Sequence, residues 1–234
     1  MLTIEGLHLH QDNLTVFKDL NAAFKPGEFW AVVGQNGVGK TTLLQTMAGI
    51  SQPRQGRVQV AGHNLFELDI AARAQQVSFL LQDQEPCLAF SVRDAVGMGR
   101  FPWRSKKQQD QAITTAALET CGISHLADRS ILKLSGGERR KVEIATCLAQ
   151  QSDFLLLDEP LNHLDVVYRQ QILKVFAEYS QQRCVVMVCH DLEVIKHHCS
   201  HVLMLMANDC YLAGTSATIL NQTNLDQLFD ARSE

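Results

Sequence analysis

The sequence has no apolar run long enough to cross a lipid bilayer. Its longest apolar runs, such as residues 154–157 and 185–188, fall far short of the ~20 residues that a transmembrane helix needs. The residues that follow Met1 do not resemble a secretory signal either. We therefore expect a cytoplasmic protein.

An excess of basic residues is also missing. Lys and Arg number 21 against 25 Asp and Glu, which gives a formal net charge of −4. Such a chain has no overall attraction for a polyanion, so nucleic acid is not expected as a partner. The seven cysteines include no close-spaced pair, which favours reduced thiols over disulfides or a thiolate zinc site. Cys199 and its histidine neighbours (His197, His198 and His201) match no standard zinc spacing.

The composition is that of a globular protein. Of the 234 residues, 46% are hydrophobic and 20% charged, so the chain can bury roughly 70–75% of its unfolded surface. The sequence has no internal repeat and no low-complexity linker. It therefore predicts one domain over residues 1–234, with a subdomain attached to its core.

Short continuous apolar runs predict buried strands of a parallel sheet, at residues 29–33, 77–81, 154–157, 185–189 and 202–206. Helical stretches lie between them, at residues 40–48, 137–150 and 168–179. This alternation is typical of a layered α/β fold. Residues 2–9 instead alternate apolar and polar side chains with period two, which predicts an antiparallel edge sheet.

The middle of the chain shows helical signals without a strong strand. Ser91 to Asp94 has the form of a capping box, and residues 106–121 read as a helix that ends before Gly122. We interpret this part as a helical insertion. The expected division is a catalytic core at 1–81 and 143–234, with the inserted segment at 82–142.

A glycine-rich loop follows the first predicted parallel strand and opens a helix. It consists of Gly34, Gln35, Asn36, Gly37, Val38, Gly39, Lys40, Thr41 and Thr42. Glycines let backbone N–H groups point inward at a phosphate, and the next helix adds the positive end of its dipole. In this pattern the lysine reaches the β- and γ-phosphates, and the threonine hydroxyl binds Mg²⁺. The loop predicts Mg·ATP as the bound nucleotide.

Two adjacent carboxylates come directly after the apolar run 154–157. They are Asp158 and Glu159, and they stand at the carboxyl end of a predicted strand, where open α/β sheets bind ligands. Alternation along the backbone would direct them differently. We expect Asp158 to face the metal and Glu159 to face the γ-phosphate, where it could orient or deprotonate water.

The run Leu134, Ser135, Gly136, Gly137 and Glu138 resembles the signature of the ABC ATPase family. Three further positions are similar to family motifs: Gln82 to the Q-loop, Asp165 to the D-loop and His190 to the switch histidine. The resemblance implies a P-loop NTPase core with a mostly parallel sheet, an N-terminal antiparallel β subdomain and an inserted helical signature subdomain. It also implies ATP hydrolysis by Lys40, Gln82, Glu159 and His190, with Mg²⁺ held by Thr41, Gln82 and Asp158.

The signature suggests how two chains would work together. Ser135 and its glycines open the helical stretch 137–150, which makes a second anion-binding helix terminus. One chain has no second triphosphate for it. As in the family, the resemblance implies a head-to-tail dimer in which Ser135 of one chain closes on the γ-phosphate held by Lys40 of the other.

Within the family, residues 91–104 and 162–165 most resemble ATPases of importers for iron chelates, haem and cobalamin. The implied partners are transmembrane permease subunits and a substrate-binding protein, at the cytoplasmic face of the membrane. We expect residues 82–104 to form the docking groove, with Phe101 and Trp103 as anchors. The alternatives are a non-transport ATPase of the cluster-assembly kind and an ATPase of another transporter class.

The sequence departs from the family pattern at three places. His10 and Gln11 stand where relatives often carry an aromatic residue that stacks on adenine, so phosphate contacts are expected to dominate nucleotide binding. Leu161 replaces the usual threonine after Glu-Pro. The run Arg139, Arg140 and Lys141 is more basic than usual, and we expect neither change to touch the chemistry.

Overall fold

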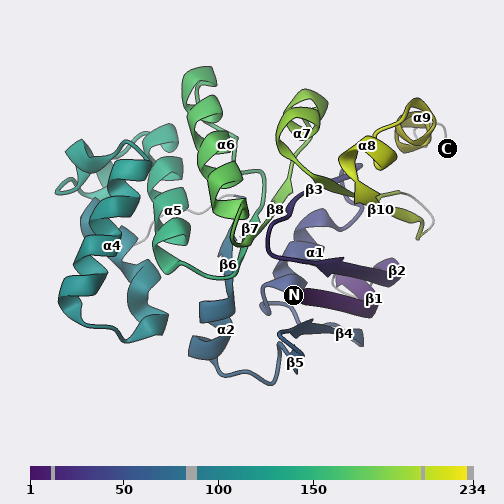
Figure 1. Cartoon of the computed structure of the whole chain (residues 1–234), viewed down its shortest axis with the longest axis horizontal. Coiled ribbons are helices and arrows are strands. Elements are labelled where there is room, and N and C mark those ends of the chain that lie inside the picture. The colour runs from purple at the N-terminus through teal and green to yellow at the C-terminus, as the bar shows by residue number, and fades with distance from the viewer. Residues whose placement is uncertain (12–13, 83–88, 207–208, 231–234) are drawn as a thin grey trace.

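The computed structural model of the chain describes residues 1–11, 14–82, 89–206 and 209–230 (Figure 1). Within this part, the strands form two sheets, one with four strands in the order β2-β1-β4-β5 and one with six in the order β10-β9-β3-β8-β7-β6. Strands and helical segments alternate along the chain from β6 to β9. The mixed α/β fold inferred from the sequence is confirmed.

The six-stranded sheet contains all five strands predicted from continuous apolar runs. They are β3 (Phe29–Gly34), β6 (Val77–Leu80), β7 (Phe154–Leu157), β8 (Cys184–Val188) and β9 (His201–Leu205), and they pair in parallel. The sixth strand, β10 (Tyr211–Thr215), is antiparallel to β9 at the sheet edge. The sequence did not predict it, because an edge strand with mostly half-buried or exposed residues carries no continuous apolar run.

The four-stranded sheet is the predicted antiparallel N-terminal subdomain. It consists of β1 (Leu2–Gln11), β2 (Leu14–Phe24), β4 (Gln55–Val60) and β5 (His63–Asn64). The apolar alternation of β1 changes phase at Gly6, where the register shifts and φ is +55°. Leu2 and Ile4 are buried before this bulge, and Leu7 and Leu9 after it.

Alternate residues of β3 face two different hydrophobic cores. Trp30 and Val32 pack into the core shared with the antiparallel sheet and α1 (Lys40–Met47). Ala31 and Val33 pack into the other core, which contains residues of α5 (Gly136–Gln150), α6 (Val166–Ser180) and α7 (Leu192–His198). The parallel sheet is therefore covered on both faces (Figure 1).

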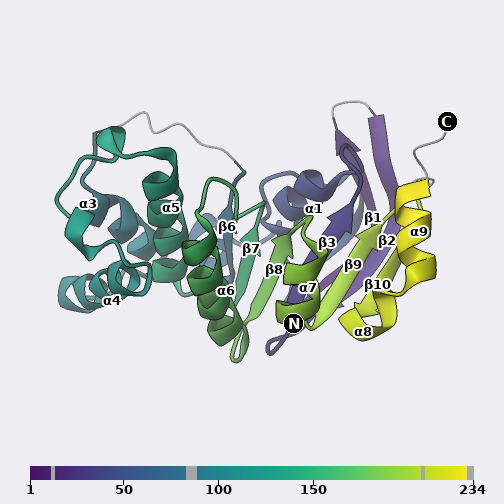
Figure 2. The same ribbon diagram turned by 90° about the horizontal axis from the view of Figure 1, so that it is seen from above.

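The inserted helices gather at one end of the molecule (Figure 2). They are α3 (Val92–Gly97), the 3₁₀ segment η1 (Met98–Trp103), α4 (Lys107–Thr120), short turns η2 (Ser124–Leu126) and η3 (Ile131–Lys133), and α5. Ser91 caps α3 by accepting a hydrogen bond from the backbone of Asp94. The predicted boundary at residue 142 falls inside α5, a single helix.

Three short helices complete the described chain. They are α2 (Ile70–Gln76), α8 (Ser216–Ile219) and α9 (Gln222–Asp230). Across the described residues, no helix has both the length and the apolar character that spanning a membrane requires.

Candidate nucleotide site

The glycine-rich loop connects β3 to α1 and curls around the start of that helix. Gly37 and Gly39 have φ values of +82° and +99°, a region that other residues adopt only under strain. Gly34 is required for a different reason, because a Cβ there would lie 2.7 Å from the Leu205 carbonyl oxygen and 2.7 Å from Val38 Cγ1. The loop therefore depends on these glycines to adopt the conformation in which its backbone N–H groups can bind a phosphate at the N-terminus of α1.

Lys40 is buried and lies within the loop. Its Nζ donates hydrogen bonds of 2.9 Å to the carbonyls of Gly34 and of Gln35. Burial lowers the pKa of Lys40, while the nearby carboxylates of Glu159 and Asp158 oppose this shift. The ammonium is thus held where the loop gathers its N–H groups and can bind phosphate oxygens there.

Asp158 follows β7 and is a buried carboxyl, with 1% of the residue exposed. Neither of its oxygens accepts a hydrogen bond from the described residues. Burial raises the pKa of Asp158, the adjacent Thr41 hydroxyl partly offsets this shift, and the neighbouring Glu159 carboxylate adds to it. An unpartnered carboxylate beside a hydroxyl fits Mg²⁺, which prefers oxygen ligands. Asp158 and Thr41 would hold the ion.

Glu159 lies at a sharp backbone turn, with φ at +47°, and its side chain lies beside three polar partners. Its Oε2 accepts hydrogen bonds from Gln82 Nε2 at 3.1 Å and from Asn162 Nδ2 at 2.7 Å. His190 Nε2 lies 3.2 Å from the other oxygen. The structure therefore brings together Gln82, Glu159 and His190, which the sequence placed in one site, and adds Asn162, to which it gave no role.

Gln82, Glu159 and His190 line a pocket of about 840 Å³ at the phosphate loop. The lining also includes His10, whose imidazole Nδ1 lies 3.2 Å from the His8 carbonyl oxygen. The other lining residues are Asn36, Gly37, Gly39, Lys40, Thr41, Thr42, Gln45, Ser51, Gln82, Glu159 and His190. The pocket thus combines phosphate-binding N–H groups, a cation and a carboxylate.

The basic run 139–141 was not expected to touch the chemistry directly, and Arg140 acts on the backbone that carries the catalytic carboxylates. Its side chain is 4% exposed, and its guanidinium donates to the carbonyls of Asp158 at 2.8 Å and of Glu159 at 3.0 Å. It also bonds the Leu81 carbonyl at 2.7 Å, directly before Gln82. Arg140 therefore holds the backbone of both carboxylates. Sequence patterns gave no sign of this, because charged residues are seldom fully buried.

The signature lies at the start of α5. Ser135 caps the helix in a reciprocal capping box: its hydroxyl accepts from the Glu138 backbone N–H, and its own backbone N–H donates to the Glu138 carboxylate. A Cβ at Gly136 would meet nothing within 4 Å, whereas one at Gly137 would lie 2.9 Å from the His163 carbonyl oxygen. None of the residues lining the 840 Å³ pocket comes from the signature. Within one chain, the structure does not bring Ser135 into the pocket of Lys40.

Comparisons with known proteins agree with this geometry. The profile of the family described as "ABC transporter" matches residues 17–162. The chain is 36% identical to the hemin import ATP-binding protein HmuV of Pseudomonas entomophila, over 98% of this chain and 92% of that protein. It is 34% identical to the cobalamin import ATP-binding protein BtuD of Halobacterium salinarum, over 99% of this chain and 59% of that protein.

Solved structures give the same result. A protein assigned to the metal-chelate type of ABC transporter, in an inward-facing conformation, is 31% identical with a TM-score of 0.82, covering 98% of this chain and 88% of that one. A dimeric ATP-binding cassette with ADP and Pi shares the fold, with a TM-score of 0.80 at 21% identity over 92% of this chain and 99% of that one. The site and fold define an ATP-hydrolysing nucleotide-binding protein. The chain belongs to the ABC transporter family.

The arrangement fits transfer of the γ-phosphoryl group to water. Lys40 and the loop N–H groups would stabilise negative charge on the transferred group, and Glu159 would orient the attacking water and accept its proton. A magnesium ion held by Asp158 and Thr41 would supply further positive charge beside the phosphates. Gln82 and Asn162 fix the Glu159 carboxylate, while His190 lies on its other side.

We expect Asp158→Asn to raise the melting temperature without Mg²⁺ and nucleotide, while ATP hydrolysis falls at least ~100-fold. The substitution removes a buried, unpartnered charge, and relief of ~1 kcal/mol raises Tm by roughly 2–4 °C in a domain of this size. Because the pKa of Asp158 is raised on folding, the destabilisation is absent below the unfolded-state pKa and appears as pH rises through the folded-state pKa. The gain in Tm should therefore shrink in acid.

Calorimetry across pH and a phosphate-release assay measure both effects. Asp128→Asn is the control, since that carboxylate is 91% exposed in its ion pair with Arg93 and should change Tm little. A lower Tm for Asp158→Asn at neutral pH would contradict the interpretation.

Proposed function

We propose that the chain is the ATPase subunit of an importer for a metal chelate of the haem, cobalamin or iron-siderophore type. The names of the relatives support the cargo class. The observation that carries the mechanism is a pocket that contains Lys40, Glu159 and His190 in a chain whose signature lies outside that pocket. Two copies, each closing its Ser135 on the nucleotide of the other, would complete both sites.

The surface near the D-loop supports a second copy as partner. Asp165 caps α6 by accepting from the Tyr168 backbone at 2.8 Å. The next two residues, Val166 and Val167, are 74% and 69% exposed. Two adjacent apolar side chains left in solvent beside a motif of the family favour burial against another chain.

The transmembrane subunits would dock on η1. A groove of about 960 Å³ lies here, and its lining includes Met98, Phe101 and Arg104. Phe101 is 85% exposed, whereas Trp103 is 36% exposed and donates its indole N–H to Gln150. Phe101 is therefore the better anchor. Residues 83–88 of the predicted groove lie outside the described residues. In this arrangement the chain sits at the cytoplasmic face of the membrane, and a substrate-binding protein delivers the cargo.

We expect Phe101→Ala to weaken assembly with the transmembrane subunits by at least ~10-fold, since a buried aromatic anchor contributes ~2 kcal/mol or more. Cells carrying it as their only copy should lose uptake of one chelate among haem, cobalamin and a ferric siderophore. Co-purification with the membrane subunits and uptake of labelled chelates measure this. Ile70→Ala, a 79% exposed apolar residue on α2, is the matched control.

Two results would go against the proposal. Normal assembly and uptake with Phe101→Ala would place docking elsewhere. Unchanged uptake of all three chelates in cells that lack the gene would favour the alternatives, a non-transport ATPase of the cluster-assembly kind or an ATPase of another transporter class.

A further inference from the structure

The C-terminal end of α5 is capped by side chains of η1. The last carbonyls of a helix have no partner within it and need one from elsewhere. Here Arg100 Nη1 donates to the Ala149 carbonyl at 2.9 Å, and Trp103 Nε1 donates to the Gln150 carbonyl at 2.6 Å. The positive guanidinium also complements the negative end of the helix dipole. The docking segment is thus bonded to the helix whose other end carries the signature.

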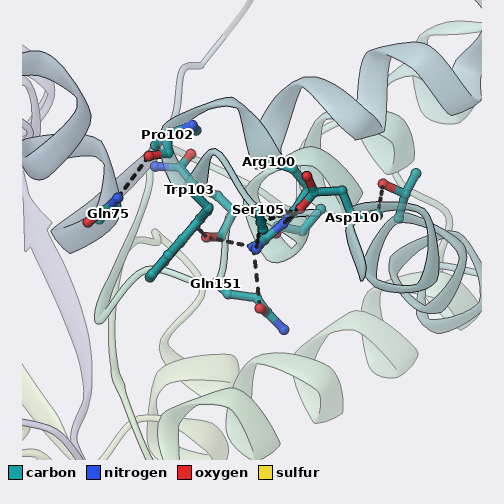
Figure 3. Close-up of polar contacts among 10 residues, drawn as sticks. Gln75, Arg100, Pro102, Trp103, Ser105, Asp110 and Gln151 are labelled. Atoms are coloured by element: carbon teal, nitrogen blue, oxygen red, sulfur yellow. Dashed lines mark hydrogen bonds and ion pairs between the residues drawn. The ribbon is translucent and has the colours of Figure 1, made fainter. Parts of the chain in front are cut away.

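All three nitrogens of the Arg100 guanidinium have partners, and Nη1 is the one that bonds the end of α5 (Figure 3). The side chain is 4% exposed, and Nε donates to Asp110 Oδ1 at 2.9 Å. Nη2 reaches Ser105 Oγ at 3.4 Å, and the group lies 5.3 Å from the centroid of the Trp103 ring. Only a planar fork with five donors can satisfy these directions together. A lysine would keep the charge but lose most of the bonds.

The backbones of η1 and α5 also touch directly. A Cβ at Gly99 would lie 2.4 Å from the Thr146 carbonyl oxygen and 3.1 Å from the Gln150 nitrogen. No side chain fits between them. Helix α2 also contacts η1, because Gln75 donates to the Pro102 carbonyl at 2.8 Å (Figure 3). Because closely packed segments are hardly compressible, a displacement of η1 is transmitted to α5.

Helix α5 connects this junction to the catalytic site. It has 15 residues, which makes it about 22 Å long. Ser135 caps its first turn, and Arg140, in the second turn, holds the carbonyls of Asp158 and Glu159. A displacement of its last turn is therefore passed to the signature and to the catalytic carboxylates.

We infer that Arg100 is a positioning residue that couples the docking surface of η1 to α5. Through this side chain, nucleotide binding changes the conformation of the docking surface, and binding of the membrane partner changes the nucleotide site. Phe101 lies in the chain between Arg100 and Trp103, which both bond the end of α5, and it is the most exposed of the three. A partner that displaces Phe101 therefore also displaces the C-terminal end of α5. The inference rests on the proposed docking at η1, and coupling of this kind must be reciprocal.

Reciprocity allows a test that needs no partner. In a Glu159→Gln background, Mg·ATP should drive the sandwich dimer, and hydrogen exchange at residues 98–104 should slow at least ~3-fold. With Arg100→Lys added, the dimer should still form, but this protection of η1 should be lost. Arg183→Lys is the matched control, because that guanidinium also lies over a ring, 4.8 Å from the Tyr179 centroid.

A second arm uses the complex with its co-purified transmembrane subunits. Isolated Arg100→Lys should hydrolyse ATP within ~2-fold of the parent, but the change in rate that assembly causes should shrink at least ~5-fold. Asp110→Asn leaves the bonds from Arg100 to the α5 carbonyls in place, so the change in rate that assembly causes should shrink less than with Arg100→Lys. This variant serves as the test if Arg100→Lys folds poorly.

The outcomes separate the two ideas. If Phe101→Ala assembles normally, docking at η1 is wrong, yet the exchange experiment still decides the role of Arg100. If a dimer forms and η1 shows no protection in the parent, or keeps it in Arg100→Lys, the inference is overturned. Parental coupling in the Arg100→Lys complex would overturn it as well.

Discussion

Glu159→Gln is expected to lower ATP hydrolysis at least ~100-fold and to convert the chain into a dimer that persists with Mg·ATP. A general base contributes typically 10²–10⁴-fold to the rate. The amide keeps the size of the side chain but cannot accept the proton of water. Gln82 and Asn162 both donate to Oε2 in the parent, so the glutamine oxygen can keep that position.

The dimer follows from mass action. If each ATP lies between Lys40 of one chain and Ser135 of the other, nucleotide that is not hydrolysed stabilises the pair. The variant should therefore elute as a dimer with ATP and Mg²⁺ and as a monomer without nucleotide. Size-exclusion chromatography and phosphate release measure the two effects.

The control for this experiment is Glu193→Gln. Glu193 is 69% exposed, forms an ion pair with Lys196 and lies outside the pocket, so its loss should change neither rate nor oligomeric state. A Glu159→Gln chain that stays monomeric with saturating Mg·ATP, or hydrolyses at the parental rate, would overturn the role given to Glu159 and weaken the sandwich model.

The fold and most of the site follow from local patterns in the sequence. The strand β3, the glycines and Lys40 lie next to one another in the chain, so their geometry is set locally. Asp158 and Glu159 were expected to face different ways by strand alternation. The structure separates them by a different means, since β7 ends at Leu157 and Glu159 has a positive φ.

What the sequence could not predict depends on contacts between distant segments. Arg100 and Arg140 are buried because carbonyls far away in the chain accept their N–H groups. Asn162 could be quoted as part of a motif, but its bond to Glu159 needs the turn at that residue. The bulge at Gly6 shifts the apolar alternation of β1, which a period-two pattern alone does not show.

Two inactive chains are expected to restore activity when mixed, if the signature acts across a dimer. Lys40→Ala removes the phosphate-binding cation, and Ser135→Arg blocks the glycine-flanked terminus of α5 with a bulky side chain. Each variant alone should lose at least ~100-fold in ATP hydrolysis, because both sites of its dimer carry the lesion. In a mixed dimer, Lys40 of the second chain faces Ser135 of the first, so one composite site is intact and the other carries both lesions.

Random pairing at equal concentrations makes half of the dimers mixed, so about one quarter of all sites are intact. The mixture should therefore exceed either variant by at least ~10-fold, as measured by phosphate release over a range of mixing ratios, with the maximum near equal amounts. The control is a chain that carries both substitutions, mixed with either single variant, which can form no intact site and should stay inactive. No gain on mixing the single variants, although each still forms dimers with the Glu159→Gln chain, would show that Ser135 does not serve the Lys40 site of the partner.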